Sequence, residues 1–156
     1  MYSANIFSLT LWWRYLCRIL GSLIPPSPIK NFFYRLGGIA VGKNVFIGYG
    51  VYFVDGFKDS LIVLADESVL SPRVTLVAMA FPGDSFLGRD YPVTKTGRVF
   101  VGEGAWIGVG AVVLPGVTLG RGCIVGANAV INQSIGELEV WVGVPGRKLK
   151  KLQKSG

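Results

Sequence analysis

A six-residue period in the second half of the chain constrains its fold more than any other feature. From residue 101 onward, the first position of each hexad is aliphatic six times in succession, and the fifth is apolar and mostly small. The aliphatic positions are Val101, Ile107, Val113, Leu119, Val125 and Ile131. The same phase runs earlier from Val41 to Tyr52 and from Leu64 to Leu76, with irregular stretches at residues 54–61 and 81–98. A period kept over this length indicates a repeat architecture.

A single hexad is too short to bury a core alone, so the hexads must stack. Each would form a short strand with one aliphatic side chain pointing inward, followed by a turn in which Gly or Asn takes a left-handed backbone conformation. The 22 glycines of this 156-residue chain suit such turns. Three sides make one coil, and stacked coils bury a continuous apolar column. The sequence therefore predicts an all-β fold, a parallel β-helix of about four to five coils.

Composition divides the chain into three segments. Residues 1–36 are apolar and aromatic and are expected to be helical. Residues 37–136 hold the β-helix, with an excursion loop at residues 81–98 that is rich in Gly, Pro and Asp. Residues 137–156 form a basic tail, in which we expect a short C-terminal helix.

The N-terminal segment predicts one helix from about residue 5 to residue 24, stopped by Pro25, and a second over Ile29–Leu36. Arg14 and Arg18 lie in the middle of the first helix. Each would cost about 3 kcal/mol at the centre of a bilayer, which argues against a membrane span. Two interpretations stay open. The helix could lie at a membrane interface, where its Trp and Tyr suit the headgroup region and its arginines suit anionic lipid, or it could pack on the protein itself.

The absence of histidine excludes several kinds of site. Without it the chain has no His general base, no Ser-His-Asp or Cys-His catalysis and no His-ligated metal, and we expect no metal site. Cys17 and Cys123 are too few for a disulfide framework, and Cys123 is expected in the core because it occupies the fifth position of a hexad. The net charge of +7 comes from cations near both ends, without a nucleic-acid-binding motif, so nucleic acid is not an expected partner.

Three strings in and after the repeat are distinctive: Trp106-Ile107-Gly108, the run from Leu114 to Gly120 and the run from Val142 to Arg147. With these strings, about residues 37–152 resemble the hexapeptide-repeat acyltransferases, in particular the maltose/galactoside O-acetyltransferase and polysaccharide acetyltransferase branch. The resemblance implies a left-handed parallel β-helix, a homotrimer with active sites between subunits, and acetyl-CoA as the donor.

One residue departs from the family pattern at the position where the resemblance places the catalytic base. The family carries a histidine, often followed by proline, where this chain has Phe81 before Pro82. Losing a general base typically costs 10²–10⁴-fold in rate. Four explanations stay open: a catalytically inactive member, an amine acceptor that needs less help, another base such as Asp84 or Asp90 in the same loop, and an inactivating substitution at Phe81 itself.

The resemblance also assigns the donor site residue by residue. Gly108 and Val109 match the backbone that contacts the pantetheine arm, and Ala127 matches a small residue that lets the arm pass. The fold itself demands small residues at such corners, so Ala127 is also explained without a ligand. Near the phosphates, Asn132 and Gln133 replace the family's Thr-Lys, which removes one cation.

Two basic positions complete this assignment. Arg147 and Lys150 match the family's cations that would hold the nucleotide phosphates. A solvated basic face is the alternative interpretation of the tail.

These observations lead to one hypothesis and one alternative. The chain is expected to be an acetyl-CoA-dependent acetyltransferase acting on a sugar hydroxyl or amine in surface-polysaccharide or lipid-linked glycan biosynthesis. It would be a cytoplasmic homotrimer, peripheral to the inner membrane through its N-terminal helix. The alternative is a catalytically inactive trimeric β-helix that binds a partner or ligand.

Overall fold

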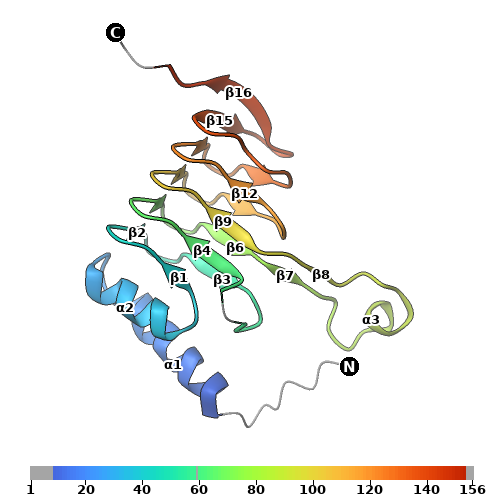
Figure 1. Cartoon of the computed structure of the whole chain (residues 1–156). Helices are drawn as coiled ribbons and strands as arrows, with labels where there is room; N and C mark the ends of the chain where they lie inside the picture. The colour runs from blue at the N-terminus through green and yellow to red at the C-terminus, as the bar shows by residue number, and fades with distance from the viewer. Residues whose placement is uncertain (1–8, 59, 154–156) are drawn as a thin grey trace.

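Parallel strands wound into coils form the body of the molecule (Figure 1). The computed structural model describes residues 9–58 and 60–153. One sheet has the order β1-β4-β9-β12, with bounds Ala40–Val41, Ile62–Leu64, Val99–Val101 and Thr118–Leu119. A second holds β2, β5, β10, β13 and β15, with bounds Phe46–Ile47, Val69–Leu70, Trp106–Ile107, Ile124–Val125 and Glu139–Val142. The third holds β3, β6, β11 and β14, with bounds Tyr52–Val54, Thr75–Val77, Val112–Val113 and Val130–Ile131.

Successive strands of the hexads lie on successive faces, so the chain winds as a parallel β-helix, as the period predicts. The aliphatic first positions of the hexads from residue 101 point inward and are at most 1% exposed. The fifth positions of the same hexads are at most 3% exposed, including Cys123. The inner column is therefore the continuous apolar core that the repeat requires.

The turns follow the same phase as the core. In the regular hexads up to residue 130, the fourth residue has a positive φ, at Asn44, Gly50, Glu67, Arg73, Gly104, Gly110, Gly116, Gly122 and Asn128. We expected Gly or Asn at these turns, and the structure adds Glu67 and Arg73, at φ 59° and 60°. A non-glycine residue in this region costs roughly 1–2 kcal/mol, which the ladders on either side must offset.

An arm leaves the coils between β6 and β9 (Figure 1). It is an antiparallel hairpin of β7 (Met79–Ala80) and β8 (Lys95–Thr96), with the short helix α3 (Phe86–Asp90) near its tip. At the base of the arm its two chain segments are joined by a hydrogen bond, in which the Gly97 amide donates to the Ala78 carbonyl at 2.9 Å. The next coil packs tightly on this point, because a Cβ on Gly97 would lie 2.6 Å from the Gly116 nitrogen.

The predicted C-terminal helix is wrong. Residues Arg147–Lys151 form strand β16, which pairs antiparallel with β15 through Glu139↔Lys151 and Val142↔Arg147. The edge of β15 would otherwise present unpaired backbone groups, and a strand that covers it satisfies them. Glu139 also accepts a hydrogen bond from Lys148, so the basic run has a partner on the sheet.

Two helices lie against the first coil (Figure 1). Helix α1 spans Leu9–Leu23 and α2 spans Pro28–Leu36, and the predicted start of the first helix lies outside the described residues. Ser27 caps α2 by accepting from the Lys30 amide. Among the described residues, no helix is long and apolar enough to cross a membrane.

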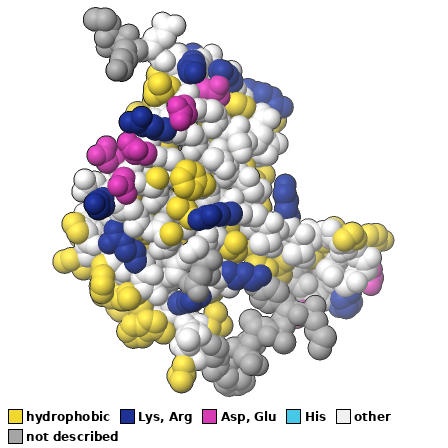
Figure 2. Space-filling model, viewed as in Figure 1, with side chains coloured by type: hydrophobic (Ala, Val, Ile, Leu, Met, Phe, Trp, Pro, Cys, Tyr) yellow, Lys and Arg dark blue, Asp and Glu magenta, His cyan; other side chains and the backbone are white. Residues whose placement is uncertain are grey.

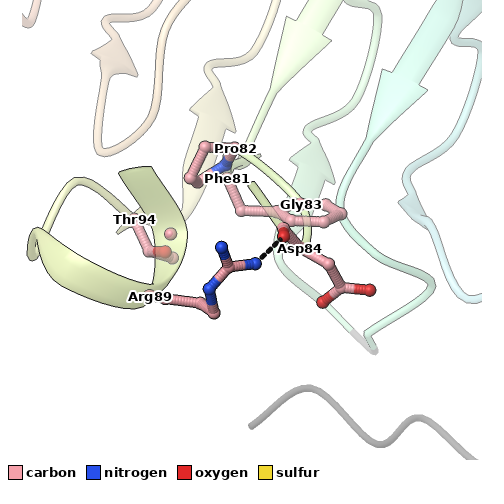
Figure 3. A pocket seen from close by; sticks show the side chains of 7 residues that line it. Phe81, Pro82, Gly83, Asp84, Arg89 and Thr94 are labelled. Atoms are coloured by element: carbon pink, nitrogen blue, oxygen red, sulfur yellow. Dashed lines mark hydrogen bonds between the residues drawn. The ribbon is translucent and has the colours of Figure 1, made fainter. Parts of the chain in front are cut away.

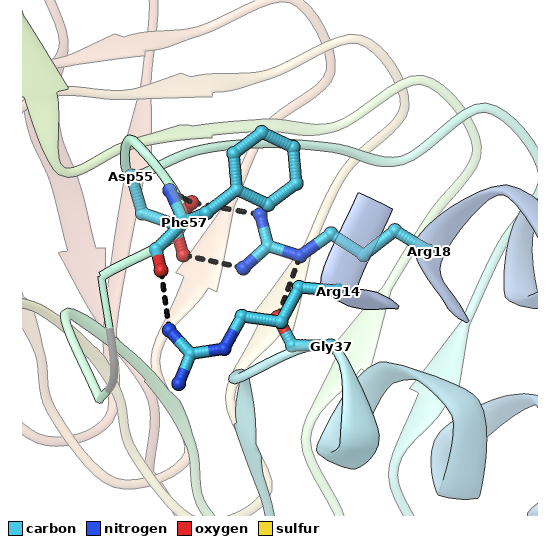
Figure 4. Close-up of polar contacts among 5 residues, drawn as sticks. All are labelled: Arg14, Arg18, Gly37, Asp55 and Phe57. Carbon is cyan, nitrogen blue, oxygen red and sulfur yellow. Dashed lines mark hydrogen bonds and ion pairs between the residues drawn. The ribbon is translucent and has the colours of Figure 1, made fainter. Parts of the chain in front are cut away.

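The arginines of α1 turn toward the protein (Figure 4), so of the two interpretations left open for this helix, the one in which its arginines contact lipid is wrong. The Arg18 guanidinium pairs with both carboxylate oxygens of Asp55, at 2.7 and 2.8 Å, and its Nε donates to the Gly37 carbonyl at 2.8 Å. Arg14 donates to the Phe57 carbonyl at 2.6 Å. These contacts join α1 to the loop between β3 and β4 and to the C-terminal end of α2.

Candidate active site

A cleft of about 500 Å³ lies at the base of the arm, around the position where the resemblance places the catalytic base (Figure 3). Its lining residues are Phe81, Pro82, Gly83, Asp84, Gly88, Arg89 and Thr94. Phe81 directly follows β7 and is half exposed. An aromatic ring therefore occupies the position that the resemblance assigns to the catalytic base.

The cleft contains one carboxylate and one guanidinium among its lining residues, and they do not form an ion pair in the structure. The Arg89 Nη1 donates to the backbone carbonyl of Asp84 at 2.6 Å, and the Asp84 carboxylate points away from the guanidinium (Figure 3). Asp84 is exposed, and Asp90, which ends α3, is not part of the lining. Sequence reasoning missed Arg89 and Thr94, and the one available signal was a cation in the same loop as Asp84.

The candidate pantetheine contacts lie together at one corner of the β-helix. Gly108 and Val109 follow β10, and Ala127 follows β13 in the next coil. The Gly108 amide donates to the Val125 carbonyl at 2.8 Å, and the Asn128 amide donates to the Val109 carbonyl at 2.8 Å. A Cβ on Gly108 would lie 2.7 Å from the Ala127 nitrogen, so glycine is required here by the close approach of two coils.

Asn132 and Gln133 lie at a different corner. They follow β14, whose sheet forms the face between the two corners, and both are exposed. An extended chain rises about 3.3 Å per residue, so the distance from Ala127 to Asn132 is at most about 16 Å. The arm with Phe81 leaves from the same corner as Asn132, two coils earlier, since β6 and β14 belong to one sheet.

The candidate phosphate contacts lie past the last coil. A cis bond joins Val144 to Pro145, and the Gly146 amide donates to the Val130 carbonyl at 2.8 Å, which fixes the start of β16 over β14. Arg147 and Lys150 are exposed on β16. The single chain thus brings Gly108, Val109 and Ala127 together, but it places Phe81 at the opposite corner of the face.

Two further side chains complete the chemical description. The Cys123 thiol is fully buried and burial raises its pKa to about 11, so it belongs to the core and is not a nucleophile.

At the C-terminal end, Glu139 is held by Lys148, by the Trp141 indole at 2.9 Å and by the Gly136 amide at 3.2 Å, and these contacts lower its pKa to about 2. Among the described residues, no cluster of three or more His, Cys, Asp or Glu could hold a metal ion.

Sequence comparison identifies the repeat and several relatives. Residues 98–133 match the family described as "Bacterial transferase hexapeptide (six repeats)". WbbJ of Escherichia coli K12, which carries the provisional name of a lipopolysaccharide biosynthesis O-acetyl transferase, is 31% identical over 162 residues, covering 86% of this chain and 79% of WbbJ. The galactoside O-acetyltransferase of the same organism is 27% identical, covering 78% of this chain and 58% of that protein. The chain spans between 52% and 58% of the length of three curated relatives that it matches.

Structural comparison agrees. A hexapeptide-repeat acetyltransferase of Vibrio cholerae O1 biovar eltor, solved with acetyl coenzyme A, aligns with a TM-score of 0.76 at 22% identity, covering 98% of this chain and 92% of that one. This likeness confirms the expected left-handed parallel β-helix.

Proposed function

The chain belongs to the hexapeptide-repeat acetyltransferase family, and from this premise we propose that it transfers an acetyl group from acetyl-CoA to a sugar. The observation that carries the proposal is the relation to WbbJ, which extends over 79% of that protein. We place the acceptor in surface-polysaccharide or lipid-linked glycan biosynthesis, on the cytoplasmic side of the inner membrane. The structure contributes the arrangement of the residues that would hold each substrate.

The donor would lie along the corner formed by Gly108, Val109 and Ala127. Gly108 lets the next coil approach closely, and the exposed Ala127 carries only a methyl group, so a narrow chain such as pantetheine would pass over this corner. Arg147 and Lys150, exposed on β16, would hold the phosphates, because guanidinium and ammonium groups form charge-assisted hydrogen bonds with phosphate oxygens.

A neighbouring copy would be needed to complete the site. Phe81 and Ala127 lie at opposite corners of one face, so a donor at the Ala127 corner would meet the arm of a neighbouring copy. The outward side chains of the second sheet form an apolar row suited to such packing. In register, this row consists of Phe46, Val69, Trp106 and Ile124. These features support the homotrimer that the resemblance implies.

The acceptor chemistry depends on Phe81. A hydroxyl attacks the thioester carbonyl efficiently only when a base takes its proton, and a phenyl ring takes none. A neutral amine attacks without prior deprotonation. Its nitrogen bonds to the carbonyl carbon, the C–S bond breaks, and the departing thiolate takes the proton lost by nitrogen. Phe81 thus favours an amino sugar over a hydroxyl acceptor, with positioning supplying the rate enhancement.

Acetyl-CoA titration by calorimetry, followed by release of the CoA thiol with amino and hydroxyl sugars, tests this proposal. Both protein cysteines are buried, so their background in a thiol assay is expected to be low. We expect acetyl-CoA binding and CoA release with an amino sugar. Absence of acetyl-CoA binding would overturn the enzyme proposal. Binding without turnover on any acceptor would support the alternative, an inactive trimeric binding protein.

The variant Phe81→His tests the position of the base. We expect it to gain transfer to hydroxyl acceptors, by about 10²-fold or more over the starting protein. Phe86→His is the matched control, because Phe86 is exposed on the same arm but does not line the cleft. Equal gains in both variants, or no gain in Phe81→His, would contradict the assignment.

A further inference from the structure

The two N-terminal helices have an inverted polarity. Three of their polar or charged side chains point toward the β-helix: Lys30 is completely buried, Asn31 is 6% exposed, and the Arg18 side chain is 11% exposed. The Lys30 ammonium donates to the Gly48 carbonyl at 3.1 Å and lies 5.3 Å from the centre of the Tyr49 ring. Burial lowers the pKa of Lys30. The inner side of this helix pair is therefore held by specific polar contacts.

The opposite side is apolar and exposed. We call it the outer helical face, and it consists of Leu9, Trp12, Trp13, Leu16, Leu20, Leu23, Ile29, Phe32 and Leu36. Each of these side chains is at least 37% exposed, and Leu9 and Leu23 reach 87% and 73%. On α1 they recur at helical spacing, so they form a continuous stripe. A contiguous apolar surface of this kind marks an interaction site.

The two helices that carry the outer helical face contain basic residues and no acidic ones. The first 54 residues contain no Asp or Glu, while they contain five Lys or Arg. Arg35 and Lys43 are exposed beside this face. In Figure 2 the acidic side chains lie over the coils and the arm, whereas hydrophobic side chains gather at the helical end. The partner that binds the outer helical face should therefore have an anionic surface over an apolar interior.

We propose that the outer helical face binds the surface of an anionic lipid bilayer, with α1 and α2 lying in its plane. Exposed tryptophans on an apolar helix face suit the headgroup region. The absence of acidic residues from α1 and α2, together with the exposed Arg35, suits the anionic headgroup of phosphatidylglycerol. A helix of 15 residues is about 22 Å long, too short to cross the hydrocarbon core, so it would lie along the surface. Packing the face on its own copy would bring the same cations together.

This binding does not depend on the proposed acetyl transfer, and the two can fail separately. Vesicles of phosphatidylcholine alone and of phosphatidylcholine with roughly one third phosphatidylglycerol are sedimented with the full chain. We expect binding to the anionic vesicles that weakens as salt rises, and much less to the neutral ones. Failure to bind anionic vesicles at low salt would overturn the proposal.

Matched variants separate the outer helical face from general charge attraction. Leu16→Glu places a carboxylate on this face, and Leu149→Glu places one on β16 at the other end of the molecule, where Leu149 is 63% exposed. Both change the net charge equally. We expect Leu16→Glu to lose at least tenfold in vesicle affinity and Leu149→Glu to lose less than twofold. Equal losses would overturn the proposal.

Further measurements test whether a loss of binding comes from lost folding or from a changed oligomeric state. Phe32→Ser removes an apolar contact without adding charge and should also lose affinity, and circular dichroism checks that each variant keeps its helices. The mass of each variant in solution is measured by light scattering. If Leu16→Glu changes the oligomeric state and leaves vesicle binding intact, the outer helical face lies between copies and the proposal is wrong.

Discussion

The β-helix and the two helices at its N-terminal end bury opposite kinds of side chain. In the coils, the inward positions are mostly aliphatic or small and apolar, with Ser68 a small polar exception, and the charged residues face outward or occupy turns. In α1 and α2, the inward positions include Arg18, Lys30 and Asn31, while the outward positions are tryptophan, leucine and phenylalanine. The coils are therefore held by repeated apolar burial, and the helices are joined to them by a few polar contacts.

This difference predicts which substitutions destabilise each region. An apolar column spreads its stabilisation over many equivalent positions, and neighbouring coils support one another. In a buried ion pair the stabilisation depends on two side chains, because removing one partner leaves the other charge without compensation. Damage to the core should thus weaken the whole body, whereas damage to the ion pair should free the helices and leave the coils intact.

The largest effect is expected inside the coils. Leu119 is fully buried and Thr118, its neighbour on β12, is exposed. Leu119→Ala removes buried methyl groups and leaves a cavity, so it should lower the free energy of unfolding by about 3–5 kcal/mol. Thr118→Ala should cost less than about 1 kcal/mol. Urea unfolding of both variants measures the difference. Similar losses in the free energy of unfolding would show that inward and outward positions do not differ in their contribution to stability.

A smaller and more local effect is expected at the attachment of α1. Asp55→Ala leaves the Arg18 guanidinium without its carboxylate, at a cost of about 3 kcal/mol. Hydrogen exchange should show α1 amides losing protection while β10 to β14 keep theirs. Asp66→Ala is the control, because the exposed Asp66 carboxylate accepts from the Lys43 amide at 2.8 Å and has no ion pair with α1. Equal protection of α1 in both variants would show that the ion pair does not hold it.

The repeat allowed the structure of the coils to be predicted from the sequence, but not the contacts by which α1 and β16 are held to them. The phase of the hexads located the buried positions and the turns, because one six-residue rule applies to every coil. No comparable rule connects Arg18 to Asp55, which is 37 residues away in a stretch without repeat. The same limitation applies to Arg147–Lys151, where pairing with the free edge of β15 overrode the local preference of a Lys-rich run for helix.

For the candidate site, sequence reasoning located Phe81 and Asp84 in one loop, and both line the cleft. It did not give the separation between this cleft and the corner of Gly108 and Ala127. That separation depends on which face each strand occupies, and the order of strands in the three sheets supplies it.

The smallest effect is expected at the far end of the body, where the attachment of β16 is polar, as that of α1 is. The hydrogen bond from Lys148, followed by that from the Trp141 indole, lowers the pKa of Glu139 from its ordinary 4.5 to about 2. The folded state therefore holds this proton more weakly than the unfolded chain does. The stabilisation is complete above about pH 4.5 and is lost as the pH falls toward 2. Hydrogen exchange of the β16 amides should show protection that falls over this range. Glu139→Gln should remove the pH dependence, and a variant that kept it would show that another carboxyl group controls the C-terminal strand.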